Sequence, residues 1–423
     1  MIGIIKKSIR NVLFRYKVVS YNMRKHSIEK KVFSKEKIRV VFFVLYDNMW
    51  KSDDLFRQLS NHDRFEPYII SSPYPHHPRK FGEENQNRVE RYFRQKNFPF
   101  IKGYNFQTDA WFDIRSFKPD IVFYQQPYNS GYDGFKIESL WKNCLFGYIP
   151  YTYELEDDPE MLNHLLPNIA WRVFLPSDED VKLKKTYLIT NGLNLVASGH
   201  PLADTLAGEE QTSVCLPWKD GSKKYKRIIW APHHSILDTD KLNYSNFLEI
   251  AEGMLELANQ FRDSIQFAFK PHPVLKRKLY KLDGWGIKKT DDYYAKWANS
   301  SNSILVEGDY SVLFNSSDGM IHDCSTFTVE YLYTQKPVMY LSKQGRRNCF
   351  NEFGVKCYEQ HYIGHNLDDI CSFLSNVIIL GNDPKATERK QFFQDYLLPP
   401  NGQSAAQNMF DEFLNSLRPN AKR

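Results

Sequence analysis

The sequence predicts an α/β protein made of two Rossmann-like domains that face each other across a cleft, preceded by a basic N-terminal helix. The chain has 423 residues, which is too long for one ordinary core and suits two domains. Short apolar runs alternate with helical stretches in both halves, and such alternation is typical of parallel sheets. A polar stretch without periodicity, residues 208–226, separates the two series. We therefore expect an arm at 1–36, domains at 37–198 and 199–395, and a helical tail at 396–423.

The N-terminal arm combines an apolar helical pattern with a concentration of positive charge. Residues 1–37 hold eleven Lys and Arg against two Glu, a net charge of +9, whereas the whole chain carries only +6. Apolar side chains recur at helical spacing at Ile2, Ile5, Ile9, Val12, Leu13 and Tyr16. An amphipathic helix with a cationic face can lie on an anionic membrane surface, or it can pack on the protein itself. The charge concentration favours the membrane.

The N-terminal half is expected to form a parallel sheet. Its apolar runs, rich in β-branched and aromatic residues, read as buried strands. They lie at 37–46, 65–72, 118–128, 144–154, 171–177 and 193–204, with helical or loop segments at 47–57 and 74–95. The run at 118–128 ends in polar residues, where an open α/β sheet usually places its ligands.

The C-terminal half repeats this organisation and ends in helices. Strands are expected at 227–232, at 265–273 and in the short run SILVEG, and a helix at 246–261. Residues 319–341 read as strand, helix and strand, and the tail reads as helical at 367–377 and 408–417.

Composition and motifs exclude several classes of protein. No glycine-rich fingerprint follows the first strand and no Walker-type loop occurs, so nicotinamide dehydrogenases and P-loop NTPases are disfavoured. The basic residues gather in one arm rather than across a folded face, which argues against nucleic acid as a partner. The six cysteines show no metal-ligand spacing and read as reduced cytosolic thiols. No run has the ~18 apolar residues of a membrane span, and no secretory signal opens the chain. We expect a cytoplasmic protein without a metal or a cofactor.

The strongest candidate site is the segment Ile321–Pro337. A strand ends at Ile321, and Ser325 and Thr326 follow where a helix would begin, so that free N–H groups and two hydroxyls favour an anion such as a phosphate. Glu330 comes about one helical turn later, from where it can reach outward to a ribose diol. The alternative is an ordinary Ser/Thr helix cap with a solvated glutamate.

Two histidine segments follow strands of the same half. Lys270-Pro271-His272-Pro273 places an imidazole between two prolines at a strand end, where it can donate to a phosphate oxygen and stabilise a leaving group. His233-His234-Ser235 follows the first strand of this half and offers further donor contacts. The alternatives are a solvent-exposed turn for the first segment and, less favoured, a metal site for the paired histidines, which lack a third ligand nearby in sequence.

The N-terminal half contributes an acidic segment, residues 151–158. It follows a strand and concentrates four carboxylates, one of which can serve as the base that deprotonates an acceptor hydroxyl. Glu154 is the candidate, and a solvated acidic loop is the alternative for its neighbours. Gly199-His200-Pro201 with Asp204 is expected to mark the crossing between the domains.

The segments APHHS, KPHP and HDCSTFTVEYLYTQKP, in this order and spacing, resemble the CDP-glycerol glycerophosphotransferase family of teichoic-acid and capsule synthesis. The resemblance covers roughly residues 193–410 and implies a GT-B fold, with the nucleotide-activated donor, such as CDP-glycerol, in the C-terminal domain. It also implies a lipid-linked or polysaccharide acceptor on the N-terminal domain and peripheral attachment to the inner face of the cell membrane. It assigns the donor diphosphate to His272, Ser325 and Thr326 and the ribose to Glu330. From their positions near strand ends, we also expect Lys270 to contact the diphosphate and the donor-site loop to include His233, His234, Ser235 and Asp323.

The sequence departs from the family in its N-terminal half. Members usually carry a His-Gly pair, read as the catalytic base, after a strand equivalent to residues 148–154. Here the sequence is GYIPYTYE, without a histidine. Glu154 is the candidate that replaces this histidine as the base, and His272 is the other catalytic candidate. Three hypotheses follow: transfer of an alditol phosphate, transfer of a sugar from a nucleotide sugar, and a non-catalytic nucleotide-binding partner in envelope synthesis.

Overall fold

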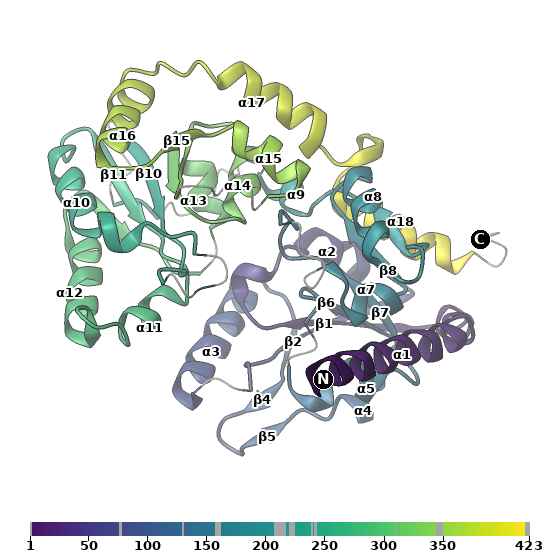
Figure 1. Ribbon diagram of the computed structural model, residues 1–423. Helices are drawn as coiled ribbons and strands as arrows, with labels where there is room; N and C mark the ends of the chain where they lie inside the picture. Colours follow the sequence, from purple (N-terminus) through teal and green to yellow (C-terminus); the bar gives the residue numbers. More distant parts are fainter. Residues whose placement is uncertain are drawn as a thin grey trace. The chain divides into compact units, whose positions relative to one another are not determined.

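The computed structural model describes residues 2–75, 78–128, 131–156, 162–206, 217–219, 225–237, 240, 243–308, 310–343 and 350–418, with side chains from residue 9 on. The chain divides into two compact units (Figure 1). Unit 1 comprises residues 1–152, 158–204 and 399–423, and unit 2 comprises residues 153–157 and 205–398. Among the described residues, no helix has the length and apolar character needed to cross a membrane.

Unit 1 is built on a seven-stranded parallel sheet in the order β3-β2-β1-β6-β7-β8-β9. This is the Rossmann order, in which the direction of strand addition reverses between β1 and β6. The strands are β1 (Ile38–Val44), β2 (Phe65–Ser71), β3 (Phe100–Lys102), β6 (Ile121–Tyr124), β7 (Leu145–Tyr148), β8 (Arg172–Leu175) and β9 (Leu195–Ala197). A separate two-stranded antiparallel ribbon pairs β4 (Tyr104–Asn105) with β5 (Ala110–Trp111).

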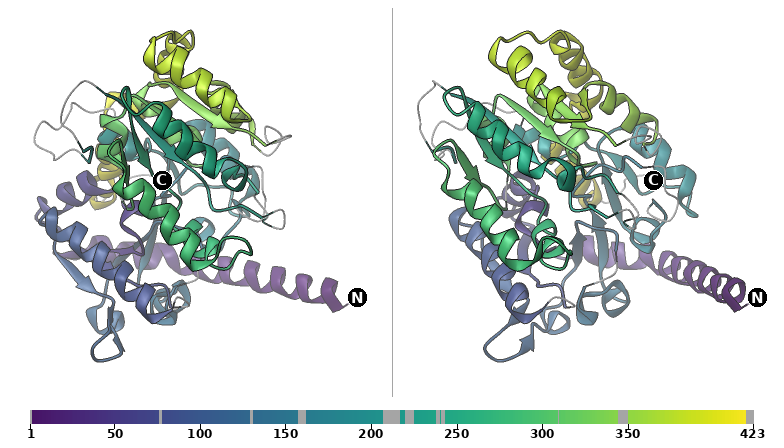
Figure 2. Two further views of the ribbon diagram at one scale, coloured as in Figure 1. Left: turned by 90° about the vertical axis from the view of Figure 1, so that its left-hand side faces the viewer. Right: turned by 60° about the vertical axis from the view of Figure 1, so that its left-hand side comes forward.

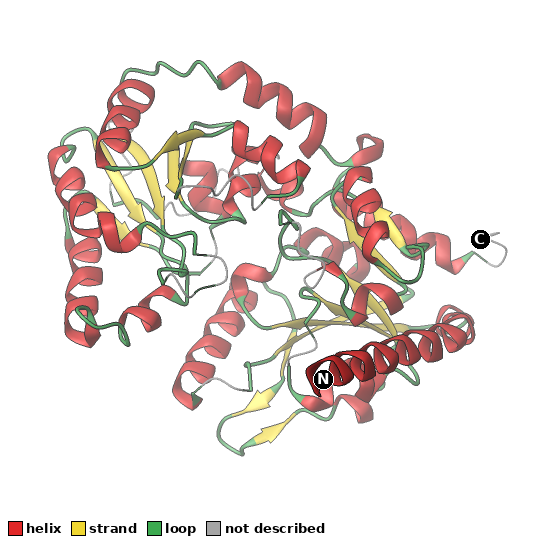
Figure 3. Ribbon diagram, viewed as in Figure 1, coloured by secondary structure: helices red, strands yellow, loops and turns green. Residues whose placement is uncertain are grey.

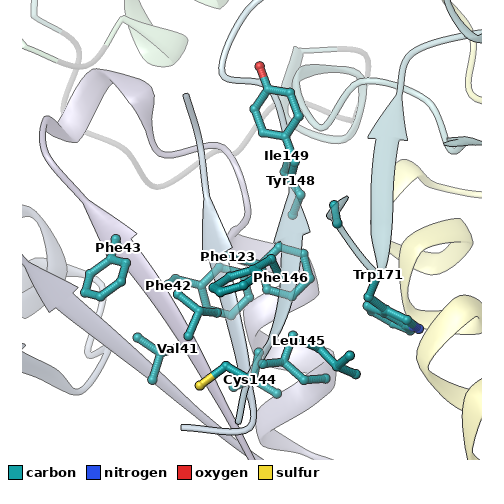
Figure 4. Packing of buried hydrophobic residues seen from close by; sticks show 14 of the residues in the cluster. Val41, Phe42, Phe43, Phe123, Cys144, Leu145, Phe146, Tyr148, Ile149 and Trp171 are labelled. Carbon is teal, nitrogen blue, oxygen red and sulfur yellow. The ribbon is translucent and has the colours of Figure 1, made fainter. Parts of the chain in front are cut away.

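Aromatic side chains fill the core of unit 1. Phe42 of β1 and Phe123 of β6 stack with ring centroids 5.0 Å apart (Figure 4), whereas Phe146 of β7 contacts Tyr21 and Tyr124. Phe43 points to the other face of the sheet and stacks on Phe135 at 4.7 Å, because successive strand residues alternate between faces. The helices of this unit are α1 (Ile2–Phe33), α2 (Asp53–Ser60), α3 (Arg79–Gln95), α4 (Ile114–Phe117), α5 (Ile137–Leu140), α7 (Leu165–Ile169), α8 (Asp178–Tyr187) and α18 (Ala405–Leu417).

Helix α1 packs on unit 1 through its C-terminal two thirds. Val18, Tyr21, Ile28 and Val32 are buried, and the Tyr21 hydroxyl donates to the Cys144 carbonyl at 3.0 Å. Lys17 forms an ion pair with Glu138 of α5 at 2.7 Å. In both views of Figure 2 the first turns of α1 project past the strands and helices that its later turns cover.

Unit 2 repeats the Rossmann order in a six-stranded parallel sheet, β12-β11-β10-β13-β14-β15 (Figure 3). Its strands are β10 (Lys226–Ala231), β11 (Ile265–Phe269), β12 (Ser303–Leu305), β13 (Gly319–His322), β14 (Val338–Leu341) and β15 (Tyr362–Gly364). Its helices are α10 (Phe247–Gln260), α11 (Leu275–Leu279), α12 (Gly286–Asn299), α13 (Ser311–Ser316), α14 (Phe327–Glu330), α15 (Glu352–Glu359), α16 (Leu367–Ser372) and α17 (Ala386–Phe392). Buried Trp230, Phe269 and Trp297 pack together at its centre.

The chain passes between the units within α9 (Leu202–Leu206) and again after Leu398. Asp204, at the first passage, accepts hydrogen bonds from the N–H groups of Ala405 and Ala406, both at 2.8 Å, and so caps α18. Gly199 has a φ of 86°, which favours glycine, and a Cβ there would lie 2.6 Å from Pro399. Residues 199–204 and 399–406 thus belong to one packed region of unit 1.

The prediction of an α/β protein with two parallel sheets is confirmed, and each strand expected from an apolar run is present. The expected orientation across a cleft stays a prediction. The observed boundaries differ from the expected ones at three places: residues 153–157 group with unit 2, residues 199–204 group with unit 1, and the helical tail groups with unit 1 from residue 399 on. Most of the expected linker at 208–226 lies outside the described residues.

Candidate functional site

The candidate site lies at the carboxyl edge of the unit 2 sheet, around β10 and β13. These two strands are where the strand order reverses, and open α/β sheets bind their ligands at such a point. The loop after β10 carries His233, His234 and Ser235, the loop after β11 carries Lys270 and His272, and Asp323 to Thr326 follow β13. The fold therefore gathers the three segments that the sequence predicted.

Three hydrogen bonds tie these loops together. The Asp323 carboxylate accepts from the backbone N–H of His233 at 2.5 Å, and the Cys324 thiol donates to the Ala231 carbonyl at 3.3 Å. The His272 N–H donates to the Pro232 carbonyl at 3.0 Å. Asp323 is 1% exposed, and burial raises its pKa to about 6 although two backbone N–H groups oppose the shift. Asp323 thus acts as a connector between loops.

The histidines of the first two loops form one cluster. The ring centroid of His272 lies 4.2 Å from that of His234 and 5.1 Å from that of His233. Burial is the first cause that lowers the pKa of His233 to about 3 and that of His234 to about 4. Burial also holds the pKa of His272 well below 6.5, and the neighbouring imidazoles and Lys270 act in the same direction. All three imidazoles are therefore neutral at pH 7.

The hydrogen bonds of the cluster assign its tautomers. His272 Nδ1 accepts from the Val274 N–H at 3.1 Å, and His233 Nδ1 accepts from the Ser235 N–H at 3.2 Å. A neutral imidazole whose Nδ1 accepts carries its proton on Nε2. His233 and His272 therefore offer Nε2–H donors, which suit phosphate oxygens.

The same three histidines also lie close enough together to be candidate ligands of one metal ion. One nitrogen from each of His233, His234 and His272 lies within 4.8 Å of the others. A zinc ion needs an Nε2 lone pair about 2.0–2.1 Å away, and two of the three rings hold a proton at that atom in the assigned tautomer. The hydrogen-bond pattern therefore favours an anion over a cation.

Ser325 and Thr326 lie directly after β13 and are partly exposed. Helix α14 covers only Phe327–Glu330 before a 3-10 turn at Tyr331–Thr334 takes over, so the contribution of a helix dipole is smaller than the sequence suggested. Thr326 stands in the cap position but makes no side-chain cap bond. The simple capping interpretation is therefore wrong for Thr326, whose hydroxyl does not bond the helix start.

Lys270 and Glu330 lie deeper than expected. Glu330 is 0% exposed and accepts from the Tyr310 hydroxyl at 2.5 Å, so the expected outward reach is wrong in this structure. Lys270 is 5% exposed, donates to the Gly308 carbonyl at 3.0 Å and lies 5.2 Å from the Tyr310 ring centre. Tyr310, which the sequence reasoning missed, therefore links the buried cation to the buried carboxylate.

The acidic segment belongs to unit 2. Its residues Tyr153 to Glu156 contact this unit: the Glu154 carbonyl accepts from Asn351, and the Glu156 carboxylate accepts from the Tyr244 hydroxyl at 2.5 Å. Glu154 itself is partly exposed. Asp157 and Asp158, the other candidates, lie outside the described residues. Tyr244 also donates its N–H to Ser235 Oγ at 2.7 Å, and this second missed residue connects the acidic segment to the histidine loop.

A comparison with known protein families shows to which family the chain belongs. The family described as CDP-Glycerol:Poly(glycerophosphate) glycerophosphotransferase matches residues 179–407, more than half of the chain. This chain belongs to that family. The match includes β10 to β14 and hence every residue of the candidate site except Glu154.

One curated protein to which this chain is similar is the minor teichoic acid biosynthesis protein GgaB of Bacillus subtilis (strain 168). It is 25% identical over 204 residues, which are 47% of this chain and 21% of the relative. The chain thus matches about a fifth of that protein's length.

Solved structures share the fold. A structure of S. aureus MnaA with UDP has a TM-score of 0.56 at 16% identity and covers 92% of this chain and 99% of its own. A variant of the wall teichoic acid polymerase TagF has a TM-score of 0.56 at 14% identity and covers 99% and 98%. A UDP-N-acetylglucosamine 2-epimerase of Listeria monocytogenes gives 0.55 at 16% over 90% and 96%. The GT-B-like class expected for this glycerophosphotransferase family member is confirmed.

Proposed function

We propose that the protein transfers glycerophosphate, or a related alditol phosphate, from a CDP-activated donor to a hydroxyl group of a lipid-linked or polysaccharide acceptor in cell-envelope polymer synthesis. The observation that supports this most directly is the pair of Nε2–H donors, His233 and His272, at the same sheet edge as Ser325 and Thr326, where the strand order of unit 2 reverses. Neutral N–H and O–H donors bind a diphosphate without needing a counter-charge at the reacting centre. Unit 2 is then the donor domain and unit 1 the acceptor domain.

The reaction is a displacement at phosphorus. The acceptor oxygen forms a new bond to the β-phosphorus, and the bond from that phosphorus to the bridging oxygen breaks, so CMP leaves with the electron pair. The leaving phosphate gains negative charge in this step, and hydrogen bonds from His272 and His233 stabilise that charge. The acceptor hydroxyl loses its proton to a base, for which Glu154 remains our candidate.

Glu330 needs a rearrangement before it can bind the ribose. Its carboxylate is 0% exposed and one of its oxygens accepts from Tyr310, so the side chain would have to become accessible before a ribose diol could reach it. The assignment of the ribose to Glu330, and that of the diphosphate to the buried Lys270, stay predictions.

The test is CMP release from CDP-glycerol with purified protein. Replacing His272 by Ala should lower kcat/KM by about 100-fold or more, the usual cost of one lost donor to a developing oxyanion, and Ser325→Ala should lower it in the same direction. His272→Gln, which keeps an N–H at a similar position, should recover part of the rate. His62 is a matched control, because its Nδ1 accepts from the Arg64 N–H in unit 1, far along the chain from the site. Wild-type rates in both site variants would refute the proposal.

A second candidate is sugar transfer from a nucleotide sugar, with attack at the anomeric carbon. The observation that favours it is the shared fold with the structure of S. aureus MnaA, which contains UDP. The released product separates the two, because sugar transfer from a UDP-sugar yields UDP and alditol-phosphate transfer yields CMP. Nucleotide binding without either product would instead identify a non-catalytic partner of an envelope-synthesis complex.

We further propose that α1 attaches the protein to an anionic membrane surface. The helix is apolar on two opposite faces: one is buried in unit 1, and the other exposes more than half of each side chain at Ile9, Val12, Leu13, Tyr16, Val19 and Met23. At 100° per residue these six form one stripe, with Arg15 on one side and Lys17 and Arg24 on the other. An apolar stripe between cations suits an interface with anionic lipids.

Sedimentation with lipid vesicles tests the membrane proposal. Wild-type protein should sediment with phosphatidylglycerol vesicles and remain in solution with phosphatidylcholine vesicles. Leu13→Glu combined with Tyr16→Glu should abolish sedimentation without touching the buried face of α1. Asn11→Glu places one such charge on exposed surface off the stripe and should change little. Unchanged sedimentation of the double variant would exclude this stripe as the contact.

A further inference from the structure

Unit 1 contains a pocket of its own, at the point where its strand order reverses. The ends of β1, β2 and β6 form it, and the polar residues that follow β6 were the ones the sequence placed at a ligand edge. Phe43, Met49, Tyr124, Gln125, Phe135 and Lys136 are among its lining residues. The volume is small, about 40 Å³, so the pocket admits the edge of a ring or a few water-sized groups and not a whole polymer unit.

One polar atom in this pocket lacks a partner. The Gln125 side chain is 6% exposed, and its Oε1 is buried without a hydrogen bond to any described residue. A buried amide oxygen left without a hydrogen bond destabilises the folded protein, and a ligand donor would relieve this. The backbone on both sides is fixed, because the Gln125 carbonyl accepts from the Tyr151 N–H at 3.0 Å and the Tyr124 carbonyl accepts from the Ile149 N–H at 3.2 Å. The backbone that carries this amide is therefore held in place.

The remaining lining includes four aromatic residues, besides Leu45, Met49, Ser72, Gln126 and Gly131, and its one lysine is paired. Phe43 stacks on Phe135, and the Tyr124 hydroxyl donates to the Phe135 carbonyl at 2.6 Å, which leaves its oxygen able to accept. Burial holds the pKa of Tyr124 well above 10, so this hydroxyl stays neutral. Lys136, the cation of the lining, is paired with Asp133 at 2.7 Å. An anionic group such as a phosphodiester would meet no free positive charge from this lysine.

We propose that this pocket binds one edge of a neutral sugar ring at the end of the acceptor. Aromatic walls suit the C–H face of a pyranose, and the Gln125 and Tyr124 oxygens suit its hydroxyl groups as donors. The inference rests on the proposed function, because it names the chemistry of the acceptor for that reaction. The proposed acceptor end is an uncharged sugar. It therefore differs from a chain made purely of glycerophosphate, in which each unit carries a negative charge.

Saturation-transfer NMR with the full chain, in the absence of any CDP donor, tests the proposal. The probes are the methyl glycosides of glucose, galactose and N-acetylglucosamine, with glycerol 3-phosphate as the anionic comparison. We expect ring-proton signals for at least one methyl glycoside and no displacement of it by glycerol 3-phosphate. Gln125→Leu should weaken that binding about tenfold, as expected for one lost buried hydrogen bond, and Gln125→Glu, which keeps an acceptor, should retain more of it.

A matched control comes from unit 2. Gln360 is also 6% exposed and its Oε1 also lacks a partner among the described residues, but it lies outside the pocket. Gln360→Leu should bind the glycoside like wild type. Absence of binding by all three glycosides, or equal binding by Gln125→Leu, would overturn the inference even if CMP release persists. Glycoside binding together with failure of CMP release would refute the proposed reaction and leave the sugar pocket standing.

Discussion

The Asp323 carboxylate accepts the backbone N–H of His233 at 2.5 Å and that of Asn246 at 2.8 Å, so a single buried side chain holds the histidine loop and the start of α10 together. Replacing Asp323 by Ala leaves both N–H groups without an acceptor. We expect a loss of about 2–4 kcal/mol of unfolding free energy, because hydrogen bonds to charged groups are strong and their buried donors are costly to leave unpaired. Urea unfolding measures this. Asp318 makes a similar bond to the Arg227 N–H at 2.8 Å but is 40% exposed, so Asp318→Ala should cost less than about 1 kcal/mol.

Acid should destabilise unit 2 through its buried histidines. Burial lowers the pKa of His233 and His361 to about 3, below the ordinary 6.5, so the folded state excludes protons that the unfolded chain binds. The stability from this difference is present above pH 6.5 and is lost as the pH falls toward 3. Asp323 acts in the opposite direction between about pH 4 and 6, because its pKa is raised. Burial also lowers the pKa of His234 and His272, so the buried histidines outnumber this single carboxyl group.

Urea unfolding midpoints at pH 7.5 and pH 5.0 check this pH dependence. The midpoint should be lower at pH 5.0. The unfolding free energy should fall by about 1.4 kcal/mol for each histidine and each pH unit below 6.5. His361→Phe removes one of these groups and should reduce the difference between the two pH values. A midpoint that rises at pH 5.0 would contradict the assignment of neutral buried imidazoles.

The Tyr310 hydroxyl should matter for stability and for nucleotide binding in different ways. Tyr310→Phe removes the partner of the buried Glu330 carboxylate, and we expect a loss of about 1–3 kcal/mol. If Glu330 binds the ribose, the same variant removes one donor that competes with the ribose hydroxyls for its carboxylate, so the affinity for CMP should be unchanged or higher. Calorimetric titration with CMP measures it. Glu330→Gln should weaken CMP binding, and equal binding of CMP by both variants and wild type would remove Glu330 from the donor site.

The C-terminal helix should contribute directly to the core of unit 1. Phe413 of α18 is 0% exposed and contacts Phe65, Phe123 and Trp171 with ring centroids 5.1 to 5.8 Å apart. Phe413→Ala should cost about 3–5 kcal/mol, the range for a buried aromatic ring. Asn415, two residues further on, is exposed, and Asn415→Ala should change the unfolding free energy by less than about 0.5 kcal/mol.

Strands were predictable where the sequence carried a long apolar run, as at Ile38–Val44 and Ile265–Phe269. The edge strands Phe100–Lys102 and Tyr362–Gly364 were missed, because edge strands are short and half solvated and their residues leave no continuous run. Helix α12 was missed for a related reason: its buried residues are Thr290, Tyr293, Tyr294 and Trp297, a polar-looking set in sequence.

The site was predictable as a set of segments but not as a set of contacts. Strand-end position brought His272 and Ser325 to one edge of the sheet, which chain order and parallel topology already imply. The depth of Glu330 and the role of Tyr310 depend on how helix α13 packs beside α14, and no local pattern encodes that distance. The placement of Glu154 with unit 2 depends on long-range bonds to Asn351 and Tyr244 from its segment.

Unit 2 is inserted into unit 1, since the chain leaves the first unit near Asp204 and returns at Pro399. During synthesis the inserted unit has all its strands before the host receives α18, whose Ala405 and Phe413 complete the host core. The first unit therefore keeps an unfilled hydrophobic surface until α18 leaves the ribosome. A premature stop near residue 400 would leave a folded donor unit joined to a host that is exposed to chaperones and proteases.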